Sequence, residues 1–280
     1  MFQGGCSRSP IPTDQPTGQP RPEPIMYEEL SVHMPCVKEI DGVFSSSAHE
    51  VVIEAPYALW VNGRQILSVM TSPSRLDDFV VGYLYTEGMI KKVDDIDSFQ
   101  IEGQTIRVLT TGKVSIRGGK KTILSGCGGD SSSIDMKKLP KICSDLVLDP
   151  SWLHKAIKIV LDSDLHVRTG GIHVVGLVTS TEMITKTEDI GRHNALDRVI
   201  GYALRTGVDL TRTCILISGR ISSEMSRKCI LAGIPVIASR GATTSLAVEM
   251  GAVTGLTIIG FIRGGKMNIY TSPERVAGAG

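Results

Sequence analysis

Strand-like and helix-like segments alternate along residues 149–280, and this alternation constrains the fold more than any other feature of the chain. Asp149-Pro150 pairs an N-cap residue with proline at the first position of a helix. Apolar runs typical of strands follow at residues 173–178, 213–218, 234–238 and 256–262, and helical patterns at residues 194–205, 223–232 and 245–250. This order is typical of a layered α/β domain with a substantially parallel sheet.

The preceding residues have a different pattern, because short apolar runs dominate there. Strands are predicted at residues 51–53, 58–61, 65–67, 105–109 and 114–116. Ser72-Pro73 is typical of a helix start, and Gly88 would end that helix. We expect residues 26–148 to form a smaller β-rich domain, which makes the chain α/β in class and α+β overall. Residues 1–25 are rich in proline and polar side chains, a composition typical of a disordered tail.

Composition and charge argue against several classes of protein. The 280 residues carry 30 basic and 29 acidic side chains, which gives no reason to expect nucleic acid or an anionic membrane as a partner. No apolar run reaches the roughly 18 residues of a membrane span. The six cysteines form no CxxC pair and the N-terminus shows no apolar signal segment, so we expect a reducing cytoplasmic setting.

Four turns that combine glycine with a basic residue coincide with the ends of predicted strands or the starts of predicted helices. They supply the candidate binding residues Arg192, His193, Ser218, Gly219, Arg220, Arg240, Arg263 and Lys266. Ligands of open α/β sheets bind outside the carboxyl ends of strands, and arginine matches phosphate oxygens. Residues 181–280 hold 12 basic and 8 acidic side chains, so we expect a phosphate-bearing, nucleotide-like ligand. Any single turn of this kind is more often a solvated loop.

Cys127 is the best candidate for a reactive group. It lies among glycine and serine residues, in the stretch 125–133, where a thiol has no packing role. The alternative is an incidental loop residue, because reactivity depends on exposure and on thiolate formation. Cys214 and Cys229 fall on a predicted strand and a predicted helix, and we expect both in the core.

His193 has three interpretations. It could cap a helix, satisfy a buried polar group, or act as a general base. The last role would need a carboxylate partner, for which Asp189 and Asp197 are the candidates.

Five segments of the sequence resemble the FdhD family. They are TGGIH at 169–173, EDIGRHNALD at 188–197, SGRISSEM at 218–225, SLAV at 245–248 and GFIRG at 260–264. The match runs in order from about Ile53 to Arg275, and the EDIGRHNALD block is highly specific. The resemblance implies a sulfurtransferase required for formate dehydrogenase activity. Such a protein takes persulfide sulfur from a cysteine desulfurase and passes it to the molybdenum bis(molybdopterin guanine dinucleotide) cofactor before that cofactor is inserted.

The same resemblance implies further properties as expectations. The fold of the second domain would be similar to that of cytidine deaminases, and the protein would form homodimers. Its partners would be a cysteine desulfurase and the catalytic subunit of formate dehydrogenase. Cys127 would carry the persulfide, and a guanine nucleotide such as GDP would mimic the bound cofactor. The residues in contact with that cofactor would include Phe261, Ile262, Arg263, Gly264, Gly265 and Lys266.

The loop of Cys127 departs from the family pattern at one position. The family loop reads CxxC, and Asp130 stands here in place of the second cysteine. The resolving thiol is missing, so an internal disulfide is excluded while a single-cysteine relay remains. Asp130 therefore favours an alternative hypothesis, a chaperone that binds the molybdenum cofactor or a guanine nucleotide without sulfur chemistry.

The deaminase reaction itself is not expected. A zinc deaminase needs a His-x-Glu motif and paired cysteines, whereas His173 is followed by Val174 and Val175. We therefore predict no metal site, because a shared fold does not bring a shared reaction.

Overall fold

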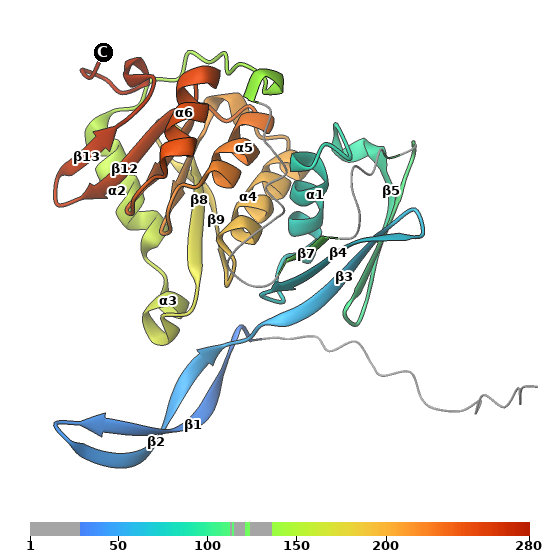
Figure 1. The fold of residues 1–280 in the computed structure, drawn as a ribbon, viewed down its shortest axis with the longest axis vertical. Helices are drawn as coiled ribbons and strands as arrows, with labels where there is room; N and C mark the ends of the chain where they lie inside the picture. The colour runs from blue at the N-terminus through green and yellow to red at the C-terminus, as the bar shows by residue number, and fades with distance from the viewer. Residues whose placement is uncertain (1–28, 113, 115–120, 124–135) are drawn as a thin grey trace, which may run out of the picture.

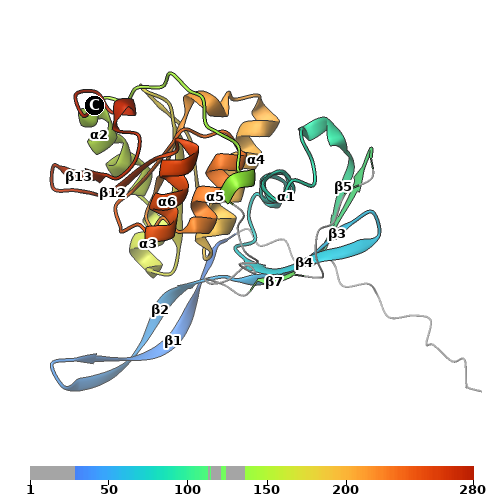
Figure 2. The ribbon, with the colours of Figure 1, turned by 45° about the horizontal axis from the view of Figure 1, so that its top comes forward.

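The computed structural model describes residues 29–112, 114, 121–123 and 136–280. In these residues the chain forms a two-stranded, a five-stranded and a six-stranded sheet, with helices around the last two (Figures 1 and 2). This mixture confirms the predicted α/β class, α+β overall. The predicted tail, most of the predicted strand at 114–116, and the loop with Cys127 and Asp130 lie outside the described residues.

The six-stranded sheet has the order β13-β12-β11-β10-β8-β9. Its strands are β8 (His173–Val178), β9 (Met183–Asp189), β10 (Cys214–Ile217), β11 (Val236–Ser239), β12 (Thr257–Arg263) and β13 (Lys266–Ile269). Only β10, β11 and β12 pair in parallel, whereas β8, β9 and β13 pair antiparallel with their neighbours. The expectation of a substantially parallel sheet is therefore wrong at both edges, where hairpins flank a parallel centre.

Helices cover both faces of this sheet and bury apolar side chains against it. They are α2 (Pro150–Leu161), α3 (Asp164–Thr169), α4 (Arg192–Thr206), α5 (Ser223–Leu231) and α6 (Ser245–Thr254). Helices α4, α5 and α6 pack on one face, and α2 and α3 on the other (Figure 1). The side chain of Asp149 caps α2 as predicted, and it accepts hydrogen bonds from the backbone N–H groups of Ser151 and Trp152. Cys214 and Cys229 are fully buried, which confirms their core assignment.

The five-stranded sheet has the order β5-β6-β3-β4-β7 and packs against one helix, α1 (Leu76–Thr86). Its strands are β3 (Ala55–Val61), β4 (Arg64–Thr71), β5 (Ile96–Glu102), β6 (Thr105–Thr110) and β7 (Lys121–Ile123). Helix α1 starts later than Ser72-Pro73 predicted, after Arg75 in a left-handed conformation. The reason is that the backbone of Ser72 hydrogen-bonds to Asp189 and Arg198 instead of starting a helix.

The third sheet is a hairpin of β1 (Ser31–Ile40) and β2 (Val43–Val52), which extends away from the rest of the molecule (Figures 1 and 2). Asp41 and Gly42 form its turn with φ values of 50° and 82°. Two positive φ angles in a two-residue loop are typical of a type I′ turn, for which Asp-Gly is a preferred sequence. In the described residues no helix is long and apolar enough to span a membrane.

Helices α1 and α4 cross in close contact, and two glycines permit this contact. A Cβ atom added at Gly201 would lie 1.8 Å from the carbonyl oxygen of Asp78. One added at Gly82 would lie 1.8 Å from the carbonyl oxygen of Asp197. The contact therefore joins the two larger sheets through backbone atoms, with no room for a side chain between them.

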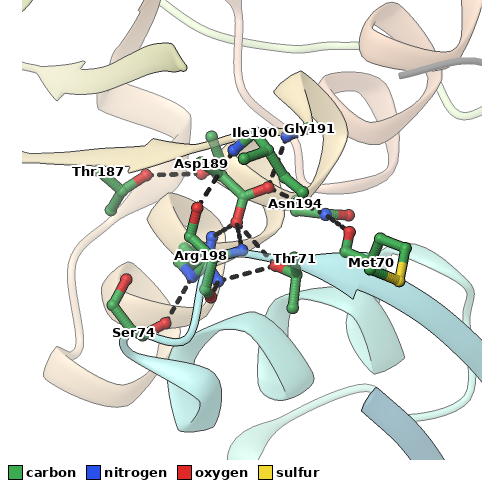
Figure 3. Close-up of polar contacts among 11 residues, drawn as sticks. Met70, Thr71, Ser74, Thr187, Asp189, Ile190, Gly191, Asn194 and Arg198 are labelled. Carbon is green, nitrogen blue, oxygen red and sulfur yellow. Dashed lines mark hydrogen bonds and ion pairs between the residues drawn. The ribbon is translucent and has the colours of Figure 1, made fainter. Parts of the chain in front are cut away.

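A buried carboxylate strengthens the same junction (Figure 3). Asp189, at the end of β9, accepts hydrogen bonds from the Thr71 hydroxyl at 2.7 Å and the Ser72 backbone N–H at 2.9 Å. Its other oxygen accepts from the Gly191 N–H at 2.6 Å and the Asn194 side chain at 3.0 Å. One carboxylate therefore binds both the end of β4, with the residue that follows it, and the start of α4.

Arg198 neutralises this carboxylate and extends the network (Figure 3). Its guanidinium donates to the Thr71 hydroxyl at 2.9 Å, the Ser72 carbonyl at 2.6 Å and the Ser74 carbonyl at 2.8 Å. Asp189 and Arg198 are both fully buried. A buried charge pair is tolerated when additional hydrogen bonds satisfy its remaining donors and acceptors, as they do here.

We predict that Gly201→Ala weakens the folded state strongly, because the new methyl group requires α1 and α4 to separate. The free energy of unfolding should fall by about 3 kcal/mol, more than the gain of up to about 1 kcal/mol in helix propensity. Urea unfolding followed by circular dichroism measures the difference. Gly112→Ala is the control, since a Cβ there meets no atom within 4 Å. Equal unfolding midpoints for the two variants would contradict the close packing.

Candidate functional site

The predicted basic turns follow the carboxyl ends of strands in the six-stranded sheet, and three of the four lead into helices. Residues 218–222 connect β10 to α5, and residues 240–244 connect β11 to α6. Ser222 and Thr244 cap these helices, since each hydroxyl accepts from a backbone N–H of the first turn. Two helix N-termini, which favour anions, therefore begin beside neighbouring parallel strands.

Hydrogen bonds hold the two turns and β12 together. The Ser239 hydroxyl donates to the Gly219 carbonyl at 2.6 Å and accepts from the Gly241 N–H at 2.8 Å. The Phe261 N–H then donates to the Gly241 carbonyl at 2.9 Å. On the other side, the Ser218 hydroxyl accepts from the Val174 N–H at 3.0 Å. These bonds fix the relative positions of the strand ends.

A pocket of about 540 Å³ opens at these strand ends. This volume is within the range of about 300–1,000 Å³ that is usual for small-molecule sites. The pocket is lined by Leu161, His166, Gly170, Gly171, Ile172, His173, Val174, Ser218, Gly219, Arg240, Gly241 and Arg263. The structure thus brings together Ser218, Gly219, Arg240 and Arg263 from the candidate binding residues.

The two arginines of the pocket are exposed and come from different strand ends. Arg263 ends β12, after a bulge in which Phe261 has a left-handed φ of 58°. Its guanidinium carbon lies 5.6 Å from the centre of the Phe261 ring, within the range of a cation–π contact. Two exposed guanidinium groups in one pocket are suited to the oxygens of a phosphate.

His173 lines the pocket, although it is not among the binding residues predicted from the basic turns. It begins β8, and burial together with the charge of Arg192 lowers the pKa of its imidazole. A Cβ atom at Gly219 would lie 3.0 Å from its Nδ1 atom, so Gly219 leaves space for the ring. The sequence signal for His173 is the TGGIH segment, which also carries part of the family resemblance.

The interpretation of His193 as a base paired with Asp189 or Asp197 is wrong. Asp189 is occupied by Arg198, and Asp197 binds the ammonium group of Lys228 with both oxygens at 2.9 Å. The Nε2 atom of His193 lies instead 3.4 Å from a carboxylate oxygen of Glu224. Burial and the nearby Arg192 lower the pKa of His193 to about 3. The imidazole is therefore neutral at physiological pH.

The remaining candidate binding residues do not line the pocket. Arg192 lies next to it, because its Cδ atom would be 3.7 Å from a Cβ at Gly219. Ile262 is 1% exposed, so its side chain belongs to the core. Gly264 and Gly265 have φ values of 58° and 73° and form the turn from β12 to β13.

Three further candidates are also absent from the pocket lining, namely Arg220, Phe261 and Lys266. Cys127 lies outside the described residues. Within the part of the chain that the structure describes, no cluster of three or more histidine, cysteine, aspartate or glutamate side chains could hold a metal ion.

Comparison with known proteins places the chain in one family. The model of the FdhD/NarQ family matches residues 52–277. A relative from Geobacillus kaustophilus named sulfur carrier protein FdhD is 32% identical over 86% of this chain and 95% of its own length. A relative of the same name from Listeria innocua is 35% identical over 84% of this chain and 94% of its own length.

A solved structure agrees with this assignment. A chain from Desulfotalea psychrophila, described as a formate dehydrogenase accessory protein, is similar in fold with a TM-score of 0.75 and 29% identity. The similarity covers 89% of this chain and all of that one. The sequence resemblance is thereby confirmed, and the chain belongs to the FdhD/NarQ family.

Proposed function

We propose that the protein is a sulfurtransferase that serves formate dehydrogenase. It takes persulfide sulfur from a cysteine desulfurase and passes it to the molybdenum bis(molybdopterin guanine dinucleotide) cofactor, its bound substrate, before insertion into the catalytic subunit. The observation that carries this proposal is the match to relatives named sulfur carrier protein FdhD over more than four fifths of the chain. A cytoplasmic setting suits this chemistry, because a reducing compartment keeps thiols free.

The pocket at the ends of β10, β11 and β12 would hold a guanine nucleotide part of this substrate. Arg240 and Arg263 line it together with the Gly219 and Gly241 backbone. Glycine permits the close approach of a phosphate to main-chain N–H groups, and guanidinium groups supply the opposite charge. GDP is therefore a suitable probe for the pocket.

Cys127 would carry the sulfur. Its thiolate attacks the terminal sulfur of the donor's persulfide, the bond between the two donor sulfurs breaks, and the donor cysteine leaves as a thiolate. Cys127 would then hold the persulfide. On delivery of the terminal sulfur the S–S bond would break and Cys127 would leave as a thiolate, and the reduced cofactor or an added reductant would supply the two electrons. A relay of this kind needs no second cysteine, so Asp130 is compatible with it.

The alternative is a chaperone that binds the cofactor or a guanine nucleotide and delivers it without sulfur transfer. Asp130 favours this function, because a nearby negative charge disfavours the thiolate form of a cysteine. Both functions use the same pocket, so only the fate of sulfur on Cys127 distinguishes them.

We predict that isotopically labelled sulfur appears on Cys127 after incubation with an active cysteine desulfurase and labelled cysteine. Mass spectrometry of the peptides should find the label in the wild type and none in Cys127→Ala. Cys143→Ala is the matched control, since Cys143 is an exposed free cysteine and its loss should leave the label in place. An unlabelled Cys127 beside an active desulfurase would reject the relay and favour the chaperone.

We predict that Arg263→Met weakens GDP binding about tenfold to a hundredfold, because a hydrogen bond to a charged group contributes about 1.5–3 kcal/mol. Isothermal titration calorimetry measures the two dissociation constants. Arg64→Met removes the same charge from an exposed position on the five-stranded sheet, and it should change the affinity less than twofold. Equal affinities for Arg263→Met and the wild type would argue against phosphate binding at this turn.

A further inference from the structure

Two histidines line the pocket, and they differ in their hydrogen bonds. They are His166 and His173, out of six histidines in the chain. The Nδ1 atom of His166 lies 3.0 Å from the carbonyl oxygen of Ile172, so one of its ring nitrogens is occupied. Within the described residues, no hydrogen bond reaches the ring of His173. Both nitrogens of that ring are therefore available to a molecule in the pocket.

Strands on both sides of His173 fix the position of its ring. His173 begins β8 and is paired with Asp189 of β9. The next residue, Val174, accepts a hydrogen bond from the Ser218 N–H at 3.0 Å and donates one to the Ser218 hydroxyl at 3.0 Å. A Cβ atom at Gly219 would lie 3.0 Å from the Nδ1 atom of His173, so the ring lies against the turn after β10. A binding group on such a framework is placed more precisely than one on a loop.

Arg192, at the start of α4, is a cation beside this ring. Its Cδ atom would lie 3.7 Å from the same Cβ position at Gly219. Asp189 also faces His173, but its carboxylate is paired with Arg198. Burial and, after it, the charge of Arg192 lower the pKa of His173 below its ordinary value. The imidazole is therefore neutral in the free protein at physiological pH.

The other titratable groups near His173 bring no negative charge to it. His193 is neutral, because its pKa is lowered to about 3. A proton on His166 would repel a proton on His173. Arg240 and Arg263 add positive charge to the pocket wall, and no carboxylate is found among the described residues that line it. Only a ligand can therefore bring a negative charge to His173 from the pocket.

We propose that His173 is a proton-linked binding residue, which takes up a proton from solvent when an anionic ligand enters the pocket and then donates a hydrogen bond to it. The proposal rests on the proposed function in one respect, which is the phosphate-bearing ligand. A phosphate oxygen near the ring supplies the negative charge that the lining side chains lack. An opposite charge within about 4–6 Å shifts a pKa by about 1–3, here upward.

This linkage gives ligand binding a direction with pH. The pKa of His173 is lowered in the free protein, and the bound anion raises it. Because the complex then holds one proton more than the free protein, the affinity for the anion rises as the pH falls through the raised pKa. The affinity becomes constant below the lowered pKa, where both forms are protonated. A rise in pH therefore favours release of the ligand.

The first test compares the pH dependence of GDP binding in the wild type and in His173→Gln. Glutamine keeps a hydrogen-bonding side chain but takes up no proton. Calorimetry between about pH 5.5 and pH 8 covers the range in which histidine titrates. Over this range the wild type should gain at least about threefold more affinity than His173→Gln. The terminal phosphate of GDP titrates at about pH 6 with both proteins, so the difference belongs to His173.

A matched control makes the same substitution at a distant site. His49 is exposed on the hairpin of β1 and β2, and His49→Gln should keep the pH profile of the wild type. Repeating the titrations in buffers with different enthalpies of ionisation counts the protons directly. The wild type should take up more protons per GDP than His173→Gln, by a number that approaches one.

The second test needs no variant that binds GDP. In wild-type protein with labelled histidine, nuclear magnetic resonance distinguishes neutral from protonated rings, and the signal of His173 is the one that His173→Gln removes. Addition of GDP should convert that ring from neutral to protonated near neutral pH. A ring that stays neutral in the complex, or parallel pH profiles for the wild type and His173→Gln, would overturn the proposal.

These outcomes separate the proposal from the proposed function. Parallel pH profiles with intact GDP binding would reject the role of His173 and leave the pocket assignment standing. An unlabelled Cys127 beside normal proton uptake would reject the sulfur relay and leave the role of His173 standing. Failure of GDP to bind the wild type would overturn both the role of His173 and the assignment of a guanine nucleotide to the pocket.

Discussion

The buried pair of Asp189 and Arg198 is the interaction on which the arrangement of the two larger sheets depends. The carboxylate lies at the end of β9, and its partners include Thr71, the last residue of β4, and Ser72, which follows it. Removing one member of a buried pair leaves an uncompensated charge, at a cost of about 3–5 kcal/mol. A small displacement between the sheets would break several of these hydrogen bonds at once. These bonds therefore hold the two sheets in one relative position. The close backbone contact of α1 and α4 at Gly82 and Gly201 adds to this constraint.

The same network reaches the pocket through adjacent residues. Asp189 accepts a hydrogen bond from the N–H of Gly191, which precedes the first residue of α4. The next residue, Arg192, lies beside Gly219 and lowers the pKa of His173 in the pocket wall. The segment after β4 therefore helps to position the basic start of α4. This explains why one short block of sequence, residues 188–197, contains both a structural carboxylate and a side chain next to the pocket.

Local signals predicted much of the structure of residues 149–280. Asp149-Pro150 defines the start of α2 through short-range contacts, and this prediction agrees with the structure. Ser72-Pro73 gave a wrong helix start because partners more than 100 residues away hold Ser72. Strand β9 was missed because it mixes apolar and polar residues at a sheet edge. The hairpin of β1 and β2 was missed as well, although Asp41-Gly42 between two β-rich segments is a hairpin signal.

Residues of the site could be predicted from the sequence only where they follow the carboxyl end of a parallel strand. Ser218 and Arg240 follow β10 and β11, and such ends meet at one edge of a sheet. His173 escaped the same reasoning because β8 runs antiparallel to β10, so its first residue lies beside the last residues of β10. The pocket therefore combines carboxyl ends of three strands with the amino end of a fourth. A sequence pattern does not give the direction of a neighbouring strand, and this reversal places the imidazole of His173 in the wall of the pocket.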